Sequence, residues 1–401
     1  MKRRSFIGGL ALAGFWQGGT FGQTARPAKI GVLNDMSSVY ADYQGIGSVI
    51  AAQMALEDSR QVIGVAAEIV SADHQNKPDI GLSIARRWFD TEGVDVILDV
   101  PNSAVALAVA QLCRDRNKVL IGSGAGSADL TGKACTPNTV HWTYDTWQLG
   151  NSYGRALTSA DAKRWFFITA DYAFGKSLEE SCASAVKGAG GEVLGSARHP
   201  IAATDFSSYL LQAQSSGADV VAFCNAGDDL NNSLKQASEF HLAPKQKLVG
   251  LIFNITNVPG LGLKACEGLE AISSFYWDLN DGTRAFSARF QAVHPRKNMP
   301  NDMQAGCYAA TLHYLKAVKK LGSATDGKAV VDTMKAIPTD DPLFGKGSIR
   351  VDGRKLHPMY LFDVKSEAES KGPWDAFKLV RTISADDSFR PLSQGGCSLV
   401  N

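Results

Sequence analysis

The chain has 401 residues, of which 45% are hydrophobic and 20% charged, and its 41 Lys and Arg almost balance its 40 Asp and Glu, for a formal net charge of +1. This balance argues against a nucleic-acid binder, because such proteins gain much of their affinity from a basic excess that neutralises phosphates. The composition also argues against disorder, which requires low hydrophobicity and high net charge. The length exceeds what one hydrophobic core usually serves, so we expect two domains.

The N terminus has the pattern of an export signal. Basic residues, including Arg3 and Arg4, precede an apolar run at 6–16, which is too short to cross a bilayer because a spanning helix takes about 20 apolar residues. The Arg pair resembles the twin-arginine form of such signals, and an ordinary secretory signal that contains two arginines is the alternative. We expect residues 1–25 to be the signal peptide and the mature protein to be periplasmic.

Beyond the signal, short apolar runs alternate with helix-length segments. This alternation predicts βαβ units and a parallel sheet that is buried on both faces. We expect strands at 29–33, 68–71, 95–98 and 118–121, and helices at 44–60, 80–89 and 103–114.

An aromatic, polar stretch at 141–148 interrupts the alternation, which then starts again. The second set has strands expected at 164–168, 192–194, 220–223 and 248–253, and helices at 176–187, 207–214 and 230–240. Further helices are expected at 284–293, 304–320 and 328–337, followed by extended segments at 344–351 and 358–364. No Pro-rich or Ser-rich linker separates the two sets, so we expect two closely joined lobes rather than tethered domains.

No catalytic or metal-binding motif is present in the sequence. It contains no H-E-x-x-H, no G-x-S-x-G and no G-x-x-x-x-G-K-[ST], and its histidines are scattered. The segment 122–126 approaches a dinucleotide fingerprint, but its third glycine comes one residue early. We therefore expect no metal, no cofactor and no enzymatic activity. A hydrolase or amidase on an α/β fold is a remote alternative, because this sequence offers no recognisable set of nucleophile, base and orienting group.

The cysteines form no C-x-x-C pair, so neither a zinc site nor a thioredoxin-like motif is supported. Their number is odd, which leaves at least one thiol unpaired. We expect a disulfide between Cys113 and Cys135.

Parallel sheets bind ligands at the carboxyl ends of their strands, in the loops that lead into helices. In the first set, Tyr40 lies in the loop after the first strand, and Asn102 and Ser103 begin a helix whose N–H groups favour an anion. A plain N-cap role for Asn102 or Ser103 is compatible with that. The glycine-rich loop offers the backbone N–H groups of Ala125 and Gly126 to a small polar ligand, or it simply makes a tight turn.

In the second set, Tyr172 and Phe174 follow the first strand, Asn225 follows the third and Asn254 follows the fourth. Aromatic side chains beside amides suit a flat apolar ligand with a polar end. We therefore expect these residues to take part in the ligand site.

The order and spacing of several segments resemble the solute-binding proteins of the branched-chain (hydrophobic) amino-acid type of ABC transporters, a leucine-binding-protein-like family. The segments are 29–33 with its Ser/Tyr loop, Pro101-Asn102-Ser103, 122–131, 171–175, and 344–347 with 351–354. The resemblance implies a type I periplasmic-binding-protein fold, in which two Rossmann-like lobes are joined by a three-crossing hinge. The crossings would lie near 144–148, 273–277 and 353–357, lobe 1 would span 27–145 plus 277–354, and lobe 2 would span 146–276 plus 355–401.

The resemblance also implies a function. A small ligand would be captured between the lobes as they close and then delivered to the membrane permease subunits of an ABC importer. We expect a monomer with no nucleic-acid partner. Ser103 would hold the carboxylate of the ligand together with the backbone at Ala125 and Gly126. Gly126 stands where the family often has Thr, and Phe174 stands where it has Tyr.

The choice between ligand classes depends on a carboxylate side chain that the family's amino-acid binders have and that 251–256 lacks here. In the amino-acid binders of the family, a carboxylate after the strand that ends near Phe253 pairs with the ammonium of the ligand. Here 251–256 contains no acid, and Asp228 and Asp229 are the only nearby substitutes. A buried ammonium without a counter-charge is unfavourable. The segment 274–278 with Thr283 and Arg284 resembles the aromatic-acid branch. We therefore favour a benzoate- or phenylpropanoid-type acid, with its ring against Tyr172 and Phe174. A branched-chain or other hydrophobic amino acid is the alternative.

A third interpretation is a ligand-sensing domain of the same fold. After the export signal the sequence contains no stretch that could span a membrane and no output domain, which argues against a sensor.

Overall fold

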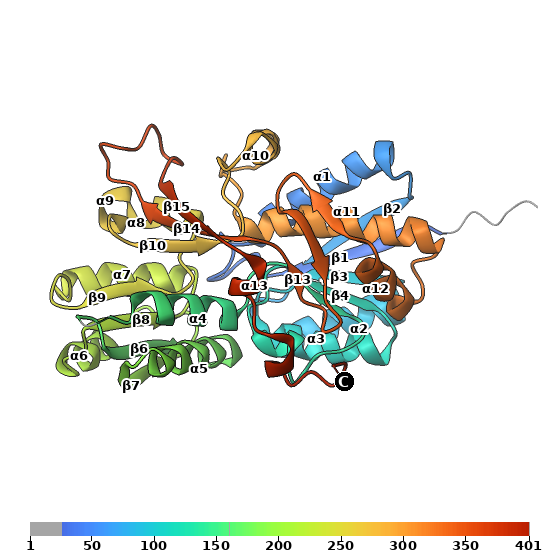
Figure 1. Cartoon of the computed structure of the whole chain (residues 1–401). Coiled ribbons are helices and arrows are strands. Elements are labelled where there is room, and N and C mark those ends of the chain that lie inside the picture. Colours follow the sequence, from blue (N-terminus) through green and yellow to red (C-terminus); the bar gives the residue numbers. More distant parts are fainter. Residues whose placement is uncertain (1–25, 160, 401) are drawn as a thin grey trace, which may run out of the picture.

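The computed structural model describes residues 26–159 and 161–400, so the expected signal peptide lies outside the described residues. Figure 1 shows two lobes side by side, each built around a sheet with helices on both faces. Both central sheets are parallel, which is the arrangement that the alternating pattern predicts.

The first lobe contains a five-stranded sheet in the order β2-β1-β3-β4-β5. Its strands are β1 (Ala28–Asn34), β2 (Ala67–Asp73), β3 (Val96–Asp99), β4 (Val119–Gly122) and β5 (Thr139–His141), and its helices are α1 (Gly45–Val62), α2 (Pro78–Asp90), α3 (Ser103–Asp115), α11 (Asp302–Leu321) and α12 (Gly327–Ala336). Successive residues of β1 point to opposite faces of the sheet: Val32 packs with α1 and α11, and Leu33 packs with α2 and α3. The strands are apolar on both faces because helices cover both faces.

The second lobe contains a four-stranded sheet in the order β7-β6-β8-β9. Its elements are α4 (Thr146–Leu157), β6 (Arg164–Ala170), α5 (Ala173–Gly188), β7 (Glu192–His199), α6 (Ser207–Ser215), β8 (Val220–Cys224), α7 (Asp228–Glu239) and β9 (Lys247–Gly250). Phe167 faces the core under α4 and α5, and the adjacent Ile168 faces the core under α6 and α7.

The remaining elements connect and flank the two sheets. They are η1 (Ala128–Thr131), η2 (Ile255–Asn257), α8 (Val258–Leu261), α9 (Leu263–Cys266), β10 (Glu270–Ser273), α10 (Asp281–Val293), β11 (Thr339–Asp341), β12 (Gly345–Ile349), β13 (Lys355–Leu356), β14 (Met359–Val364), β15 (Phe377–Ile383), α13 (Ala385–Ser388) and η3 (Leu392–Gln394). Within the described residues the chain passes between the lobes after β5, after β10 and around β13, close to the three expected crossings.

Several elements differ from the sequence-based expectation: β7 extends to His199, and β5, β10 and β15 were not expected as strands. Two further differences have a local cause. The stretch 141–148, expected to be irregular, contains the start of α4, whose N terminus is capped by Asp145 accepting a hydrogen bond from Gln148 N at 2.8 Å. The strand expected at 248–253 ends at Gly250, because the chain turns there before η2. Both errors lie where the chain leaves a sheet, and there side-chain capping rather than periodicity decides the backbone.

The predicted disulfide between Cys113 and Cys135 is wrong. Cys135 pairs with Cys397, with Cα atoms 5.6 Å apart across a sequence separation of 262 residues. Cys113 is a free, fully buried thiol on α3, packed in the apolar core between α2, α3 and the sheet. Its side chain therefore faces away from the loop that carries Cys135.

The disulfide holds the C-terminal tail against the first lobe. Arg390 Nη2 donates a hydrogen bond to Ala128 O at 3.0 Å, and Arg350 Nη1 donates to Arg390 O at 2.8 Å. Figure 1 shows the chain ending on the side of the first lobe. The end of the segment 355–401, which the sequence assigns to lobe 2, thus packs on lobe 1, because a covalent bond and these hydrogen bonds draw it there.

Substituting Cys397→Ser is expected to lower the free energy of unfolding by about 2–4 kcal/mol, because the disulfide restricts the unfolded chain. Cys135→Ser should have the same effect, and the double variant should be no less stable than either single variant, since all three lack the same bond. Urea unfolding followed by circular dichroism provides the measurement. Additive losses in the double variant would contradict the pairing, as would more than the five expected thiols in the unfolded, non-reduced protein.

Candidate functional site

A narrow cavity lies between the two lobes, at the carboxyl ends of their strands. Five of its nine lining residues are aromatic and none carries a formal charge: Tyr40, Tyr43, Gln44, Pro101, Gly124, Tyr144, Tyr172, Phe174 and Ala226. The first lobe supplies residues that follow β1, β3, β4 and β5, and the second lobe supplies residues that follow β6 and β8. A parallel sheet brings the ends of its strands to one edge, so two facing sheets place these loops opposite one another.

The two lobes are closed on each other around this cavity. The hydroxyls of Tyr40 and Tyr172 are 2.5 Å apart across the cleft, and Asp228 N donates a hydrogen bond to Val39 O at 3.1 Å. The cavity has a volume of about 10 Å³, which is about the room that one water molecule needs. A larger ligand can therefore enter only when the lobes move apart about their hinge.

The tyrosines of the cavity are neutral hydrogen-bond donors. Burial raises the pKa of Tyr144 well above its ordinary value, and its hydroxyl donates to Gly124 O at 2.8 Å. Burial also raises the pKa of Tyr43, whose hydroxyl donates to Asn257 Oδ1 at 2.7 Å. These bonds fix the ring positions, so the cavity has preformed aromatic walls.

Of the residues predicted from the sequence, Tyr40, Tyr172 and Phe174 line the cavity. Gly126 lies directly beside it, because a Cβ atom at this position would come within 2.7 Å of the Phe174 ring. Ala125 is fully buried behind it, and its carbonyl accepts a hydrogen bond from His141 Nε2 at 2.6 Å.

Asn102 and Ser103 hold the cleft edge of the first lobe together. Asn102 Oδ1 accepts hydrogen bonds from Ala104 N and Val105 N at 3.0 and 3.2 Å, so it is the N-cap of α3. Ser103 Oγ accepts a hydrogen bond from Ser127 N at 3.1 Å and so joins α3 to the glycine-rich loop. Both side chains are buried immediately after Pro101, which lines the cavity.

Asn225 and Asn254 are not among the lining residues of the cavity. Asn225 Nδ2 lies 3.1 Å from His199 Nε2, inside the second lobe. Asn254 caps η2 by accepting a hydrogen bond from Thr256 N at 2.9 Å. Both amides follow strands, as the sequence indicates, but local hydrogen bonds hold them in the second lobe.

The sequence reasoning missed six lining residues: Tyr43, Gln44, Pro101, Gly124, Tyr144 and Ala226. Four of them, Tyr43, Pro101, Gly124 and Ala226, lie in loops that the strand-end rule selected, whereas Tyr144 lies in the stretch expected to be a hinge crossing. Gln44 was assigned to the start of the first helix, and nothing in the sequence shows that its side chain faces the cleft.

Three buried carboxyl groups lie close to the cleft. Burial raises the pKa of Asp99 and of Asp302 to about 6 each, and it raises the pKa of Asp229 to about 7. Asp229 Oδ2 accepts a hydrogen bond from Ala202 N at 3.1 Å, while its Oδ1 has no partner among the described residues. Within residues 26–159 and 161–400, no group of His, Cys, Asp and Glu side chains is placed to hold a metal ion.

The raised pKa of Asp229 makes stability depend on pH. A folded-state pKa of about 7, against an ordinary 3.8, gives a stabilising contribution that is complete below about pH 4 and is lost as the pH rises through 7. The free energy of unfolding should therefore fall between pH 5 and pH 8, and Asp229→Asn should reduce the fall by about 1–4 kcal/mol. Urea unfolding at both pH values provides the measurement, with the exposed Asp340→Asn as control. Equal pH dependence in wild type and Asp229→Asn would contradict this assignment.

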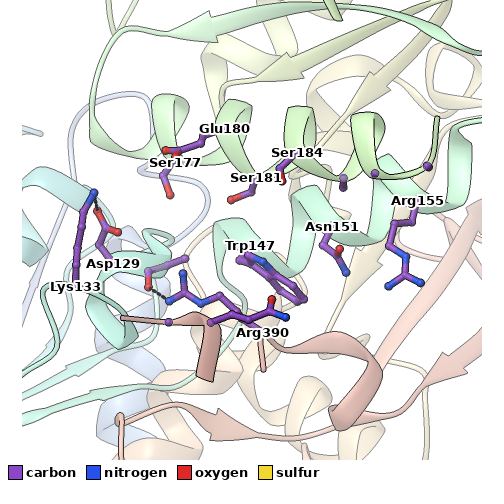
Figure 2. Close-up of a pocket in the computed structure, with 16 residues that line it drawn as sticks. Asp129, Lys133, Trp147, Asn151, Arg155, Ser177, Glu180, Ser181, Ser184 and Arg390 are labelled. Atoms are coloured by element: carbon purple, nitrogen blue, oxygen red, sulfur yellow. Dashed lines mark hydrogen bonds and ion pairs between the residues drawn. The ribbon is translucent and has the colours of Figure 1, made fainter. Parts of the chain in front are cut away.

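A second, larger hollow of about 740 Å³ is lined by residues of both lobes (Figure 2). Helices α4 and α5 form one side of it, and residues near Asp129 together with the C-terminal tail form the other. Lys133 is paired with Asp129 at 3.3 Å, and Arg390 donates to Ala128 O. Arg155 also lines the hollow. We regard the cavity between the lobes as the candidate ligand site, because it lies at the carboxyl ends of the strands of both sheets.

Known proteins share this architecture. The sequence profile of the family described as periplasmic binding protein matches residues 27–372. A periplasmic binding protein from Burkholderia mallei has a TM-score of 0.90 and 44% identity, over 94% of this chain and 99% of that one. A periplasmic ligand-binding protein of a branched-chain amino acid ABC transporter, from Burkholderia xenovorans LB400, has a TM-score of 0.81 and 40% identity, over 93% and 100%.

A more distant structure is an ABC-transporter solute-binding protein from R. palustris in complex with benzoate, with a TM-score of 0.81 and 20% identity over 93% of this chain and 100% of that one. In the part of this chain that the structure describes, no helix is long and apolar enough to cross a membrane. The family match covers residues 27–372, and the matched structures share the parallel two-lobed fold and include binding proteins of ABC transporters. The chain therefore belongs to the periplasmic binding protein family.

Proposed function

We propose that this protein captures a small aromatic carboxylate of the benzoate or phenylpropanoid type between its lobes and delivers it to the permease of an ABC importer from the periplasm. The observation that carries the proposal is the lining of the cavity, which combines five aromatic rings with no charged side chain. Flat rings gain from burial against aromatic walls, and the neutral walls offer an ammonium group no counter-charge.

The carboxylate would bind at the edge of the first lobe. The backbone N–H groups of Ala125 and Gly126 have no hydrogen-bond partner among the described residues, and both are buried. Ser103 lies beside them at the start of α3, where the helix dipole favours negative charge. Uncharged donors of this kind can hold an anion without a cationic side chain.

The ring would bind against the second lobe. The rings of Tyr172 and Phe174 have centroids 6.0 Å apart, and the rings of Tyr40 and Tyr43 face them from the first lobe with centroids 6.5 Å apart. A ligand between these pairs would contact both lobes at once. Binding energy that depends on both lobes favours the closed form, which is the form that a permease could distinguish from the empty, open one.

A hydrophobic amino acid is the second candidate ligand. The Burkholderia xenovorans protein, at 40% identity, is described as part of a branched-chain amino acid transporter. The R. palustris structure is a complex with benzoate, an aromatic acid. At 20% identity, its similarity to this chain is a similarity of fold. The two candidates differ in one physical requirement: an amino acid needs a partner for its ammonium, and the cavity lining contains no carboxylate.

A thermal-shift panel separates the two ligand classes. Benzoate and phenylpropanoid acids are expected to raise the Tm of the wild type, because a ligand that binds only the folded state stabilises it. Leucine and valine should leave it unchanged. Ser103→Ala should weaken benzoate binding at least about tenfold, because it removes about one hydrogen bond to the charged carboxylate. Calorimetry provides the measurement. A Tm increase with leucine or valine and none with any aromatic acid would refute the aromatic assignment.

Substituting Gly126→Ala is expected to block closure. The new Cβ would lie 2.7 Å from the Phe174 ring and 3.1 Å from the Tyr144 ring, so benzoate affinity should fall at least about tenfold. Gly122→Ala is the matched control in the same segment, because its Cβ would meet no atom closer than 3.5 Å. Calorimetry should find the control within about twofold of wild type. Unchanged affinity in Gly126→Ala would mean that the cleft does not close here on the ligand.

A further inference from the structure

Gln44 has a buried polar atom that nothing in the protein satisfies. It lines the cavity with only 1% of its surface exposed, and its Oε1 has no hydrogen-bond partner among the described residues. The other polar side chains of the lining are all bonded: Tyr43 to Asn257, Tyr144 to Gly124, and Tyr40 to Tyr172. Several buried side-chain atoms of the described residues lack a partner, and Gln44 is the residue among them that lines the cavity, where a ligand group could supply one.

The position of Gln44 is fixed by its backbone. Its N–H donates to Tyr40 O at 3.1 Å, and its carbonyl accepts hydrogen bonds from Ser48 N at 3.1 Å and from Gln304 Nε2 at 3.3 Å. These bonds hold it between the Tyr40 loop and the start of α1. The side chain therefore extends into the cavity lining from a backbone that hydrogen bonds hold in place, which a residue that contacts a ligand requires.

The orientation of the amide follows from its neighbour. Gln44 Nε2 lies 2.6 Å from Met303 Sδ, and a thioether sulfur can accept a hydrogen bond but cannot donate one. The NH₂ group therefore faces the sulfur, and the carbonyl oxygen is the atom left over. Gly124 leaves room for this arrangement, because a Cβ atom there would come within 3.0 Å of Nε2.

We propose that Gln44 is a specificity-determining residue whose Oε1 accepts a hydrogen bond from an O–H group on the ligand. This inference rests on the proposed function and narrows it: the ligand is a hydroxylated aromatic acid rather than an unsubstituted one. A site built to pair a ligand hydroxyl discriminates against the analogue that lacks it, because the buried acceptor is then left unsatisfied. The hydroxyls of Tyr43 and Tyr144 cannot take the role, since they already donate to Asn257 Oδ1 and Gly124 O.

Calorimetric titration with benzoate and with 2-, 3- and 4-hydroxybenzoate tests the proposal. The wild type is expected to bind at least one hydroxybenzoate about tenfold or more tightly than benzoate. Gln44→Met, which keeps the length but removes the amide, should bring that ratio to within about twofold while leaving benzoate affinity within about threefold. Gln44→Glu should retain the preference, because it retains an acceptor. Gln148→Met is the matched control, since Gln148 also has a buried, unpartnered Oε1 but is outside the cavity lining.

The outcomes are distinct. A preference that survives Gln44→Met, or a wild type that does not distinguish benzoate from any hydroxybenzoate, would overturn the role of Gln44 and leave the proposed function standing. Titration with leucine and with 4-methylpentanoate separates the remaining case. If only leucine binds, and Gln44→Met weakens leucine binding, the proposed aromatic ligand is wrong. Gln44 Oε1 then accepts a hydrogen bond from the ammonium of the ligand instead of the proposed hydroxyl. If no acid binds, both proposals fail. Gln44→Asn, which draws the amide back by one methylene, repeats the test if the Met variant does not fold.

Discussion

The buried guanidinium of Arg354 joins two of the three segments of the hinge. It is fully inaccessible to solvent and donates hydrogen bonds to Thr143 O, to Tyr144 O at 3.3 Å and to Asp145 Oδ2 at 3.4 Å. Burial lowers its pKa to about 10, so it remains charged at neutral pH. A buried charge is tolerated only when it is paired and hydrogen-bonded, so the crossing after β5 must lie against the crossing at β13.

The geometry of the cleft depends on that hinge. His141, at the end of β5, holds Ala125 O, and Thr146 N, at the start of α4, donates to Gly126 O at 2.7 Å. The carbonyls of Ala125 and Gly126 are thus bound to the hinge, whereas Gly124 N and Ser127 N donate within the first lobe. The same loop meets Phe174 of the second lobe, where only a glycine leaves room for closure. Hinge, loop and aromatic wall therefore form one connected unit.

The predictions succeeded where burial imposes a hydrophobic periodicity on the sequence. They failed where local hydrogen bonds determine the backbone or the direction of a side chain. The expected strand at 29–33 corresponds to β1 because both faces of that strand are covered by helices. Helix α4 was missed because it begins inside a stretch of aromatic and polar residues, and its cap, Asp145, is also a hinge residue. The strand-end rule led to Tyr172 and Phe174, which line the cavity, and equally to Asn225, which a hydrogen bond to the His199 ring holds inside the second lobe.

The amino-acid sequence by itself determined the parallel α/β character, the two lobes and the strand ends beside which the cavity lies, because hydrophobic periodicity and chain direction are local properties. Tertiary structure alone decided three further features. Cys135 pairs with Cys397 rather than Cys113, the C-terminal tail returns to the first lobe, and the side chain of Gln44 reaches the cleft with an acceptor unsatisfied. Each depends on contacts between segments far apart in the chain, and no local pattern encodes which distant surfaces will meet.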